Sequence, residues 1–147
     1  MNQLCQQRRD GAQCEAVLWD LAGGETLAVL DHGKAVVNAV ATIEAGGRTL
    51  IVTGATDGLR VWDSHGRLVT HRDDVGRVQA LACGHRDDTP VVVAGHGREV
   101  HVWEVDGMAV RQHFVFPQDV RAVAVEPGGD IAIGFDSDVG VWSRGAR

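Results

Sequence analysis

The sequence predicts an all-β protein built from repeats of about forty residues, and three observations lead to this prediction. The stretch TLIVTGATDGLRVWD at 49–63 consists of two β-branched runs around a glycine-containing turn, which is typical of a β-hairpin. Its ending recurs as VLWD at 17–20, VHVWE at 100–104 and VGVWS at 139–143, so Trp19, Trp62, Trp103 and Trp142 lie 43, 41 and 39 residues apart. The frame VNAVA at 37–41 returns in the same phase as VQALA at 78–82 and VRAVA at 120–124.

This repeated pattern resembles the WD-repeat (WD40) family from about Ala16 onward. The residues that carry the resemblance are Gly54, Asp57, Gly58, Trp62 and Asp63, preceded by Val37, Ala39 and Val40. The resemblance implies four-stranded antiparallel blades stacked as a β-propeller, in a single domain over residues 1–147. Because propellers have four to eight blades, the expected total of about three and a half blades makes an incomplete or partial propeller.

The chain is expected to begin with a blade remnant over residues 1–30. A strand over 16–20 ends in the first tryptophan-acid pair, a turn follows at 22–24, and 25–30 reads as the next strand. In the family's order these are the third and fourth strands of a blade. Residues 1–15 are polar and fit no repeat position well, although 2–6 is a candidate strand and Asp10-Gly11 a candidate turn.

Three further blades are expected over about 37–70, 78–114 and 120–143. The first has predicted strands at 37–42, 50–53, 59–62 and 67–70, with turns at 45–47 and 54–58. The second has strands that begin near 78, 90, 100 and 110, and the third has strands at 120–125, 131–133 and 139–143. The third blade is therefore expected to lack its outermost strand.

In the resembled family, a hydrogen-bonded relay of a His, a Ser or Thr, an Asp and the Trp often holds each blade. The resemblance assigns these places in the first complete blade to His32, Thr53, Asp57 and Trp62. These four residues are expected to be structural, because an orphaned buried polar group costs about 1–3 kcal/mol and a closed relay avoids that cost.

The other two blades depart from this relay. In the second blade Val93 and Gly97 fall at the Ser/Thr and Asp positions, so no relay is expected there. In the third blade Ile133 replaces the Ser/Thr, and either Asp136 or Asp138 is the turn acid. Both blades should be held mainly by apolar packing.

Positions that vary inside a constant frame are candidates for partner binding. The frame V-x-A-[VL]-A carries Asn38, Gln79 and Arg121 at x, near the starts of the innermost strands, where members of the resembled family commonly contact partners. The full set of candidates is Asn38, Thr56, Asp73, Asp74, Arg77, Gln79, His96, Asp119 and Arg121. The alternative is that these side chains are only solvated, since exposed polar residues at loop ends usually are.

No catalytic residue, cofactor or metal is predicted. His96 and His101 are five residues apart, which along one strand would place them on opposite faces, and no cysteine pair completes a zinc set. HRDD at 71–74 and 85–88 resembles a kinase tetrapeptide without the motifs that accompany it in kinases. A hydrolase or metal-dependent enzyme that uses the histidine-rich second blade is the alternative to a non-enzymatic protein.

Composition limits the classes of partner and the cellular location that are expected. A formal net charge of -6 disfavours nucleic acid or an anionic membrane as the main partner. Cys5, Cys14 and Cys83 lack the paired spacing of a disulfide framework, and the start MNQLCQQRRD lacks the apolar core of a signal peptide. The expectation is a cytoplasmic WD-repeat scaffold that presents loop surfaces to protein partners.

A partial propeller is not expected to close as a monomer. Its missing blades would come either from a complementary propeller half or from a second copy in a homo-oligomer. In the second case the strand at 25–30 of one copy would complete the last blade of the other. Both alternatives are open.

Overall fold

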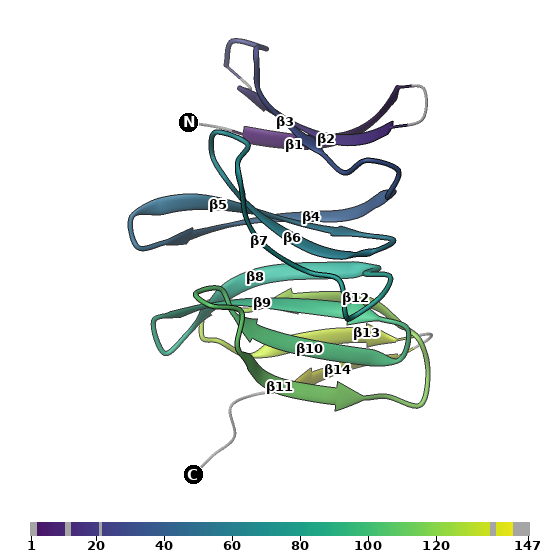
Figure 1. The fold of residues 1–147 in the computed structure, drawn as a ribbon. Helices are drawn as coiled ribbons and strands as arrows, with labels where there is room; N and C mark the ends of the chain where they lie inside the picture. Colours follow the sequence, from purple (N-terminus) through teal and green to yellow (C-terminus); the bar gives the residue numbers. More distant parts are fainter. Residues whose placement is uncertain (1–2, 11–12, 21, 136–137, 143–147) are drawn as a thin grey trace.

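The computed structural model describes residues 3–10, 13–20, 22–135 and 138–142, which form four antiparallel β-sheets (Figure 1). Sheet 1 contains β1 (Gln3–Asp10), β2 (Gln13–Asp20) and β3 (Thr26–Asp31). Sheet 2 contains β4 (Val37–Ala45), β5 (Arg48–Ala55), β6 (Gly58–Asp63) and β7 (Leu68–Arg72). Sheet 3 contains β8 (Ala80–Arg86), β9 (Thr89–His96), β10 (Glu99–Glu104) and β11 (Val110–Val115). Sheet 4 contains β12 (Val120–Val125), β13 (Ile131–Phe135) and β14 (Asp138–Trp142).

The prediction of an all-β protein with antiparallel sheets is confirmed, because within each sheet every strand pairs antiparallel with the strand beside it. The sheets follow one another in chain order, and β4 contacts β8, which contacts β12 (Figure 1). No helix long and apolar enough to cross a membrane occurs in the described part of the chain.

The hairpin of β5 and β6 illustrates how local sequence sets the strands. Ala55 pairs with Gly58, so the turn is only Thr56 and Asp57, shorter than the predicted turn at 54–58. Gly58 has a φ of 134°, and a Cβ at this position would lie 2.1 Å from the carbonyl oxygen of Arg72. Only glycine fits here, because a side chain would collide with the backbone of β7.

The strand register shows which strands of different sheets correspond. Each repeat tryptophan lies opposite an apolar residue of the preceding strand, in the pairs Leu4 with Trp19, Ile51 with Trp62, Val92 with Trp103 and Ile131 with Trp142. Strands β1, β2 and β3 therefore correspond to β5, β6 and β7, and β12, β13 and β14 correspond to β4, β5 and β6. Sheet 1 has no counterpart of β4 among the described residues, and sheet 4 has no counterpart of β7 there.

Residues 1–30 begin with a strand that is longer than the candidate strand at 2–6. The polar strand β1 pairs with β2 along its whole length, from Gln3 opposite Asp20 to Asp10 opposite Gln13. The candidate strand at 2–6 covers only its first half, and Asn2 and Gly11 lie outside the described residues. Strand β3 pairs with β2 of its own chain and is an edge strand of sheet 1.

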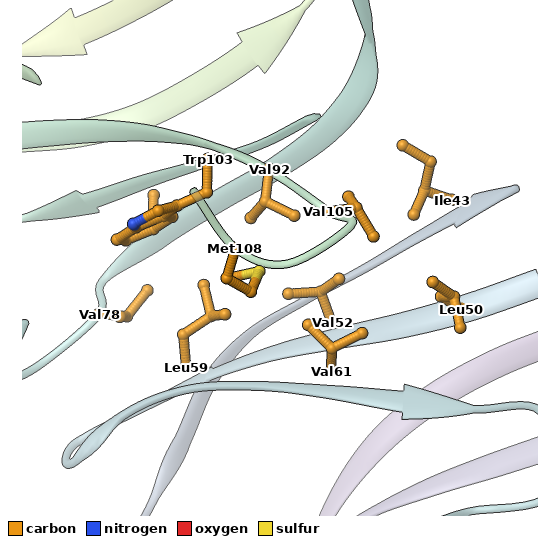
Figure 2. Packing of buried hydrophobic residues seen from close by; sticks show 11 residues of the cluster. Ile43, Leu50, Val52, Leu59, Val61, Val78, Val92, Trp103, Val105 and Met108 are labelled. Carbon is orange, nitrogen blue, oxygen red and sulfur yellow. The ribbon is translucent and has the colours of Figure 1, made fainter. Parts of the chain in front are cut away.

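Apolar side chains fill the spaces between successive sheets. Figure 2 shows the cluster in which Val52 and Val61 of sheet 2 lie across from Val92 of sheet 3, and similar clusters join sheets 1 and 2 and sheets 3 and 4. The closest approaches occur at glycines. A Cβ at Gly54 would lie 2.4 Å from Val78 Cγ1, and a Cβ at Gly95 would lie 2.9 Å from Val120 Cγ1.

One face of sheet 4 repeats the pattern of these covered faces but has none of the other described residues packed on it. Ile131 and Ile133 face sheet 3, so the alternate residues of the sheet face away. This free face of sheet 4 consists of Ala122, Ala124, Ala132, Gly134, Val139 and Val141. Val61 and Val102, the residues before their repeat tryptophans, are 0% exposed, whereas Val141 at the same repeat position is 59% exposed. Sheet 4 therefore presents an apolar flank to solvent.

Candidate functional site

All nine candidates for partner binding lie at one edge of the stacked sheets. At this edge β4 begins opposite the end of β5, and β12 begins opposite the end of β13. The turn of β5 and β6, the turn of β9 and β10, and the loop between β7 and β8 lie at the same edge, because successive antiparallel strands reverse direction. We call it the loop edge.

Four of these candidates meet in one cavity. Asn38, Arg77, Gln79 and Arg121 line a cavity of about 350 Å³ together with Val120, and we call it the polar pocket. The four polar side chains belong to exposed residues, whereas Val120 is buried. The pocket thus combines the variable positions of three successive V-x-A frames, which the sequence alone placed only near the starts of separate strands.

The backbone around the polar pocket is held from several directions. The N–H of Val78 donates to Ala55 O at 3.0 Å, that of Gln79 to Gly95 O at 2.9 Å, and that of Val120 to Gly97 O at 2.8 Å. Asn38 Nδ2 donates to Val78 O at 3.0 Å, which ties β4 to the segment that leads into β8. These hydrogen bonds hold the backbone from which the polar side chains of the pocket project.

The other candidates have different surroundings. Thr56 joins its turn to Val36, because Val36 N donates to Thr56 Oγ1 at 3.1 Å and Thr56 N donates to Val36 O at 3.0 Å. Asp74 forms an ion pair with Arg72 at 2.9 Å. Asp73 and Asp119 belong to the exposed residues of the loop edge. His96 does not belong to the exposed surface as expected, since it is only 8% exposed and lies in a histidine cluster.

Three of the four expected relay residues are joined in sheet 2. Trp62 Nε1 donates to Thr53 Oγ1 at 3.0 Å, and Thr53 Oγ1 lies 2.7 Å from His32 Nε2. His32 Nδ1 lies 2.7 Å from the carbonyl oxygen of Leu30, which can only accept, so Nδ1 carries the proton. Burial lowers the pKa of His32, which favours the neutral ring with Nε2 free to accept from the threonine hydroxyl.

The assignment of Asp57 to this relay is wrong. Both ring nitrogens of His32 have other partners, and both carboxylate oxygens of Asp57 accept from Arg60 at 2.8 Å. Asp57 lies in an exposed turn three residues before Arg60, where a two-pronged guanidinium reaches it readily. The hydrogen bond from Arg60 lowers the pKa of Asp57.

Sheet 3 has no equivalent of the relay. The register aligns Thr53 with Ala94 and Asp57 with Arg98, so the expected equivalents Val93 and Gly97 are each wrong by one residue. Ala94 offers no hydroxyl, and the buried Trp103 Nε1 has no hydrogen-bond partner among the described residues.

Rings pack around Trp103 in place of that hydrogen bond. The indole is stacked with His101 at 5.3 Å and lies under the guanidinium of Arg72 at 5.8 Å. In sheet 4, Ile133 occupies the position of Thr53, as expected, and Asp136 lies outside the described residues.

A histidine cluster lies between sheets 2 and 3 near the loop edge. His96 Nε2 lies 2.6 Å from His101 Nδ1, His101 stacks on His113 at 4.1 Å, and His113 Nε2 lies 2.7 Å from Glu99 Oε1. The expectation that His96 and His101 lie on opposite faces is wrong, because they belong to two strands of one hairpin. His96 pairs with Glu99 across the two-residue turn, which puts His96, Glu99 and His101 on the same face.

The histidine pKa values predict that acid destabilises the fold. Burial lowers the pKa of His32 and of His96, and burial together with His113 lowers the pKa of His101 to about 4. Between these values and the ordinary value of 6.5 the unfolded chain binds more protons than the folded chain. The stabilising contribution is complete above 6.5 and is lost as the pH falls towards about 4.

Chemical denaturation at several pH values checks this expectation. The free energy of unfolding should fall between pH 7 and pH 5, and His101→Asn should make that decline less steep. The pKa values of Glu99 and Asp74 are also lowered, but their contributions are lost below this window. Stability that stays constant or rises on acidification to pH 5 would contradict the neutral histidines.

The cysteine Cys83 and the two HRDD segments show no sign of a catalytic role. Burial raises the pKa of the Cys83 thiol to about 12, so it is not a thiolate nucleophile at neutral pH. His85 Nε2 donates to Glu44 O at 3.0 Å, and Arg72 of the first HRDD donates to Met108 O at 2.8 Å. Within the described residues, no group of three or more His, Cys, Asp or Glu side chains has a geometry that could hold a metal ion.

A larger cavity of about 590 Å³ lies between sheets 2 and 3 at the edge opposite the loop edge. It is lined partly by turn residues such as Gly46 and Gly107 and by the apolar Leu50, Val61 and Val69. None of the predicted site residues lines it. The polar pocket is therefore the stronger candidate for a functional site.

No protein-family model matches the chain, and no curated protein matches it.

Proposed function

We propose that this chain is a non-enzymatic interaction module of the WD-repeat type, which binds a protein partner through its loop edge. The observation that carries the proposal is the polar pocket, where Asn38, Gln79 and Arg121 from three consecutive repeats meet. Variable polar residues on a constant repeat frame are what a partner-specific surface requires. The proposal includes a cytoplasmic location, in keeping with cysteines that lack the spacing of a disulfide framework.

The same proposal includes a β-propeller that is completed by further blades. The free face of sheet 4 supports it, because it repeats the faces of sheets 2 and 3 that the next sheet covers. Gly134 corresponds to Gly54 and Gly95, which receive Val78 and Val120 from the start of the following sheet.

The occupant of the free face should therefore begin with a Val-x-Ala strand. Sheet 1 of a second copy has no such strand among its described residues. A complementary propeller half with a complete blade is the better candidate, and a homo-oligomer is the second.

A triple variant tests the binding surface. Replacing Asn38, Gln79 and Arg121 with Ala should lower the free energy of unfolding by no more than about 1.5 kcal/mol, because all three residues are exposed and the change removes the hydrogen bond from Asn38 to Val78 O. Capture of an identified partner by the purified chain should fall at least about tenfold, as expected when polar contacts central to an interface are removed. Replacing Arg48, Arg67 and Glu44, which are exposed and lie at or near the opposite edge, is the control. Undiminished capture by the triple variant would show that the polar pocket is not the binding surface.

One alternative is a metal-dependent enzyme that uses sheet 3, which would require the histidine cluster to rearrange, because no group of such side chains in the described part of the chain has a geometry that could hold a metal ion. Its specific observation is that His96, His101, His113 and Glu99 lie together on one face. Thermal denaturation with added zinc or nickel separates the two functions. A large rise in Tm that His96→Ala and His101→Ala abolish would favour the enzyme, and an unchanged Tm would favour the interaction module.

A further inference from the structure

The polar pocket contains two arginines without partners. Arg60, Arg72 and Arg111 form ion pairs with acidic side chains, but within the described part of the chain neither Arg77 nor Arg121 has an ion pair or side-chain hydrogen bond. No carboxylate lines the pocket. In a chain with a formal net charge of -6, this is a locally cationic place with unused donors.

The two arginines project from positions that the fold holds firmly. Val78, next to Arg77, packs where a Cβ at Gly54 would lie 2.4 Å from it, and Val120, next to Arg121, packs in the same way against Gly95. Both valines are buried, with exposed fractions of 0% and 1%. The main-chain bonds of Val78 and Val120 add to this anchoring. The backbone that carries the two guanidinium groups is thus already ordered, which reduces the entropy cost of binding a ligand.

Guanidinium groups of this kind select oxyanions, because their planar N–H groups match two oxygens at once. The amides of Asn38 and Gln79 add donors and acceptors that suit a peptide group. The exposed Asp73 and Asp119 lie at the same edge and would repel a long polyanion such as a nucleic acid. The surroundings therefore fit a short acidic element that is flanked by neutral or basic residues.

We propose that the polar pocket binds the carboxylate side chains of a short acidic segment in a protein partner, with Arg77 and Arg121 as the recognising residues. This inference rests on the proposed interaction function and names the chemistry of its partner. A cavity of about 350 Å³ has room for one or two side chains and is at the small end of the range for ligand sites.

The test uses the full chain and two labelled peptides, Gly-Ser-Glu-Glu-Ser-Gly and its counterpart with Gln in place of Glu. Fluorescence anisotropy measures binding, and inorganic phosphate is titrated separately. The acidic peptide should bind at least about tenfold more tightly than the Gln peptide, and Arg77→Gln or Arg121→Gln should each weaken it by about tenfold or more. Arg67→Gln is the matched control, because it removes the same charge from the turn between β6 and β7 at the opposite edge.

Three results would overturn the inference. These are equal binding of the two peptides, an equal loss with Arg67→Gln, and binding of inorganic phosphate without the acidic peptide, which would indicate a site for a free anion. The partner-capture assay separates this failure from failure of the proposed function. If the triple variant loses capture while the acidic peptide does not bind, the interaction module stands and the acidic ligand is wrong. If the acidic peptide binds while the triple variant still captures the partner, the polar pocket binds carboxylates, but it is not the surface that binds the partner.

Discussion

Replacing Val102 with Asp should unfold most of the chain, whereas replacing Val141 with Asp should leave it folded. The two valines occupy the same repeat position, one residue before Trp103 and Trp142, but Val102 is 0% exposed and Val141 is 59% exposed. Burying an unpaired carboxylate in the cluster between sheets 3 and 4 should cost more than about 3 kcal/mol, a large part of the stability of a domain of this size. The exposed carboxylate at 141 should cost less than about 0.5 kcal/mol.

Chemical denaturation at low protein concentration, where association is minimal, measures both changes. Val61→Asp is the second buried member of the comparison, since Val61 is 0% exposed in the cluster between sheets 2 and 3. The free energy of unfolding should fall by similar large amounts in Val61→Asp and Val102→Asp and should hardly change in Val141→Asp. Equal losses at all three positions would mean that the outer face of sheet 4 is covered within the single chain.

Trp62→Phe should destabilise the chain by about 1–2 kcal/mol more than Trp103→Phe. Both changes remove the same ring volume, and the difference between them is the indole N–H. Trp62 Nε1 donates to Thr53 Oγ1, so its loss breaks the relay to His32. Trp103 Nε1 is buried and has no partner in the part of the chain that the structure describes, so removing it relieves an unsatisfied donor.

A double-mutant cycle with Thr53→Val isolates the hydrogen bond, because the two side chains are in contact and should couple. Trp62→Phe and Thr53→Val should together cost less than the sum of the two single changes. Asp57→Ala is the contrasting control, and its loss should stay below about 1 kcal/mol, since the ion pair that Asp57 forms with Arg60 is exposed. A larger loss for Trp103→Phe than for Trp62→Phe would contradict the relay.

Much of sheets 2 to 4 could be predicted because each repeat shows the same alternation of apolar and polar residues at equivalent positions. Of the residues that begin the three frames, Val37 and Val120 also begin the inner strands β4 and β12, and Val78 lies two residues before β8. The segments that end in Trp62, Trp103 and Trp142 are central or edge strands as expected. The variable positions of those frames meet in the polar pocket for the same reason: equivalent places in adjacent sheets lie side by side.

The misses have physical causes that a single sequence does not express. Strand β1 reads QLCQQRRD, a polar segment that is held in a sheet by its pairing with β2 and not by its own alternation. Separation along the chain suggested opposite faces for His96 and His101, but the turn between them folds one strand onto the next. Asp57 was assigned to the relay by position, whereas the nearby Arg60 occupies both of its oxygens.

Light scattering of the purified chain tests the central proposal most directly. This proposal is that the chain is a section of a propeller with an apolar face left for another blade. At micromolar concentration the account predicts a mass above the 15.7 kDa of one chain, unless a complementary half is supplied. Val141→Asp should return the mass to that of a monomer, and Gly134→Ala should prevent the docking of a complementary half. A Cβ at Gly134 meets only ordinary contacts within the chain, at 3.6 Å from Ala122 Cβ, but would block an incoming valine. A wild-type chain that remains a well-folded monomer of 15.7 kDa and recruits no further blade would contradict the account.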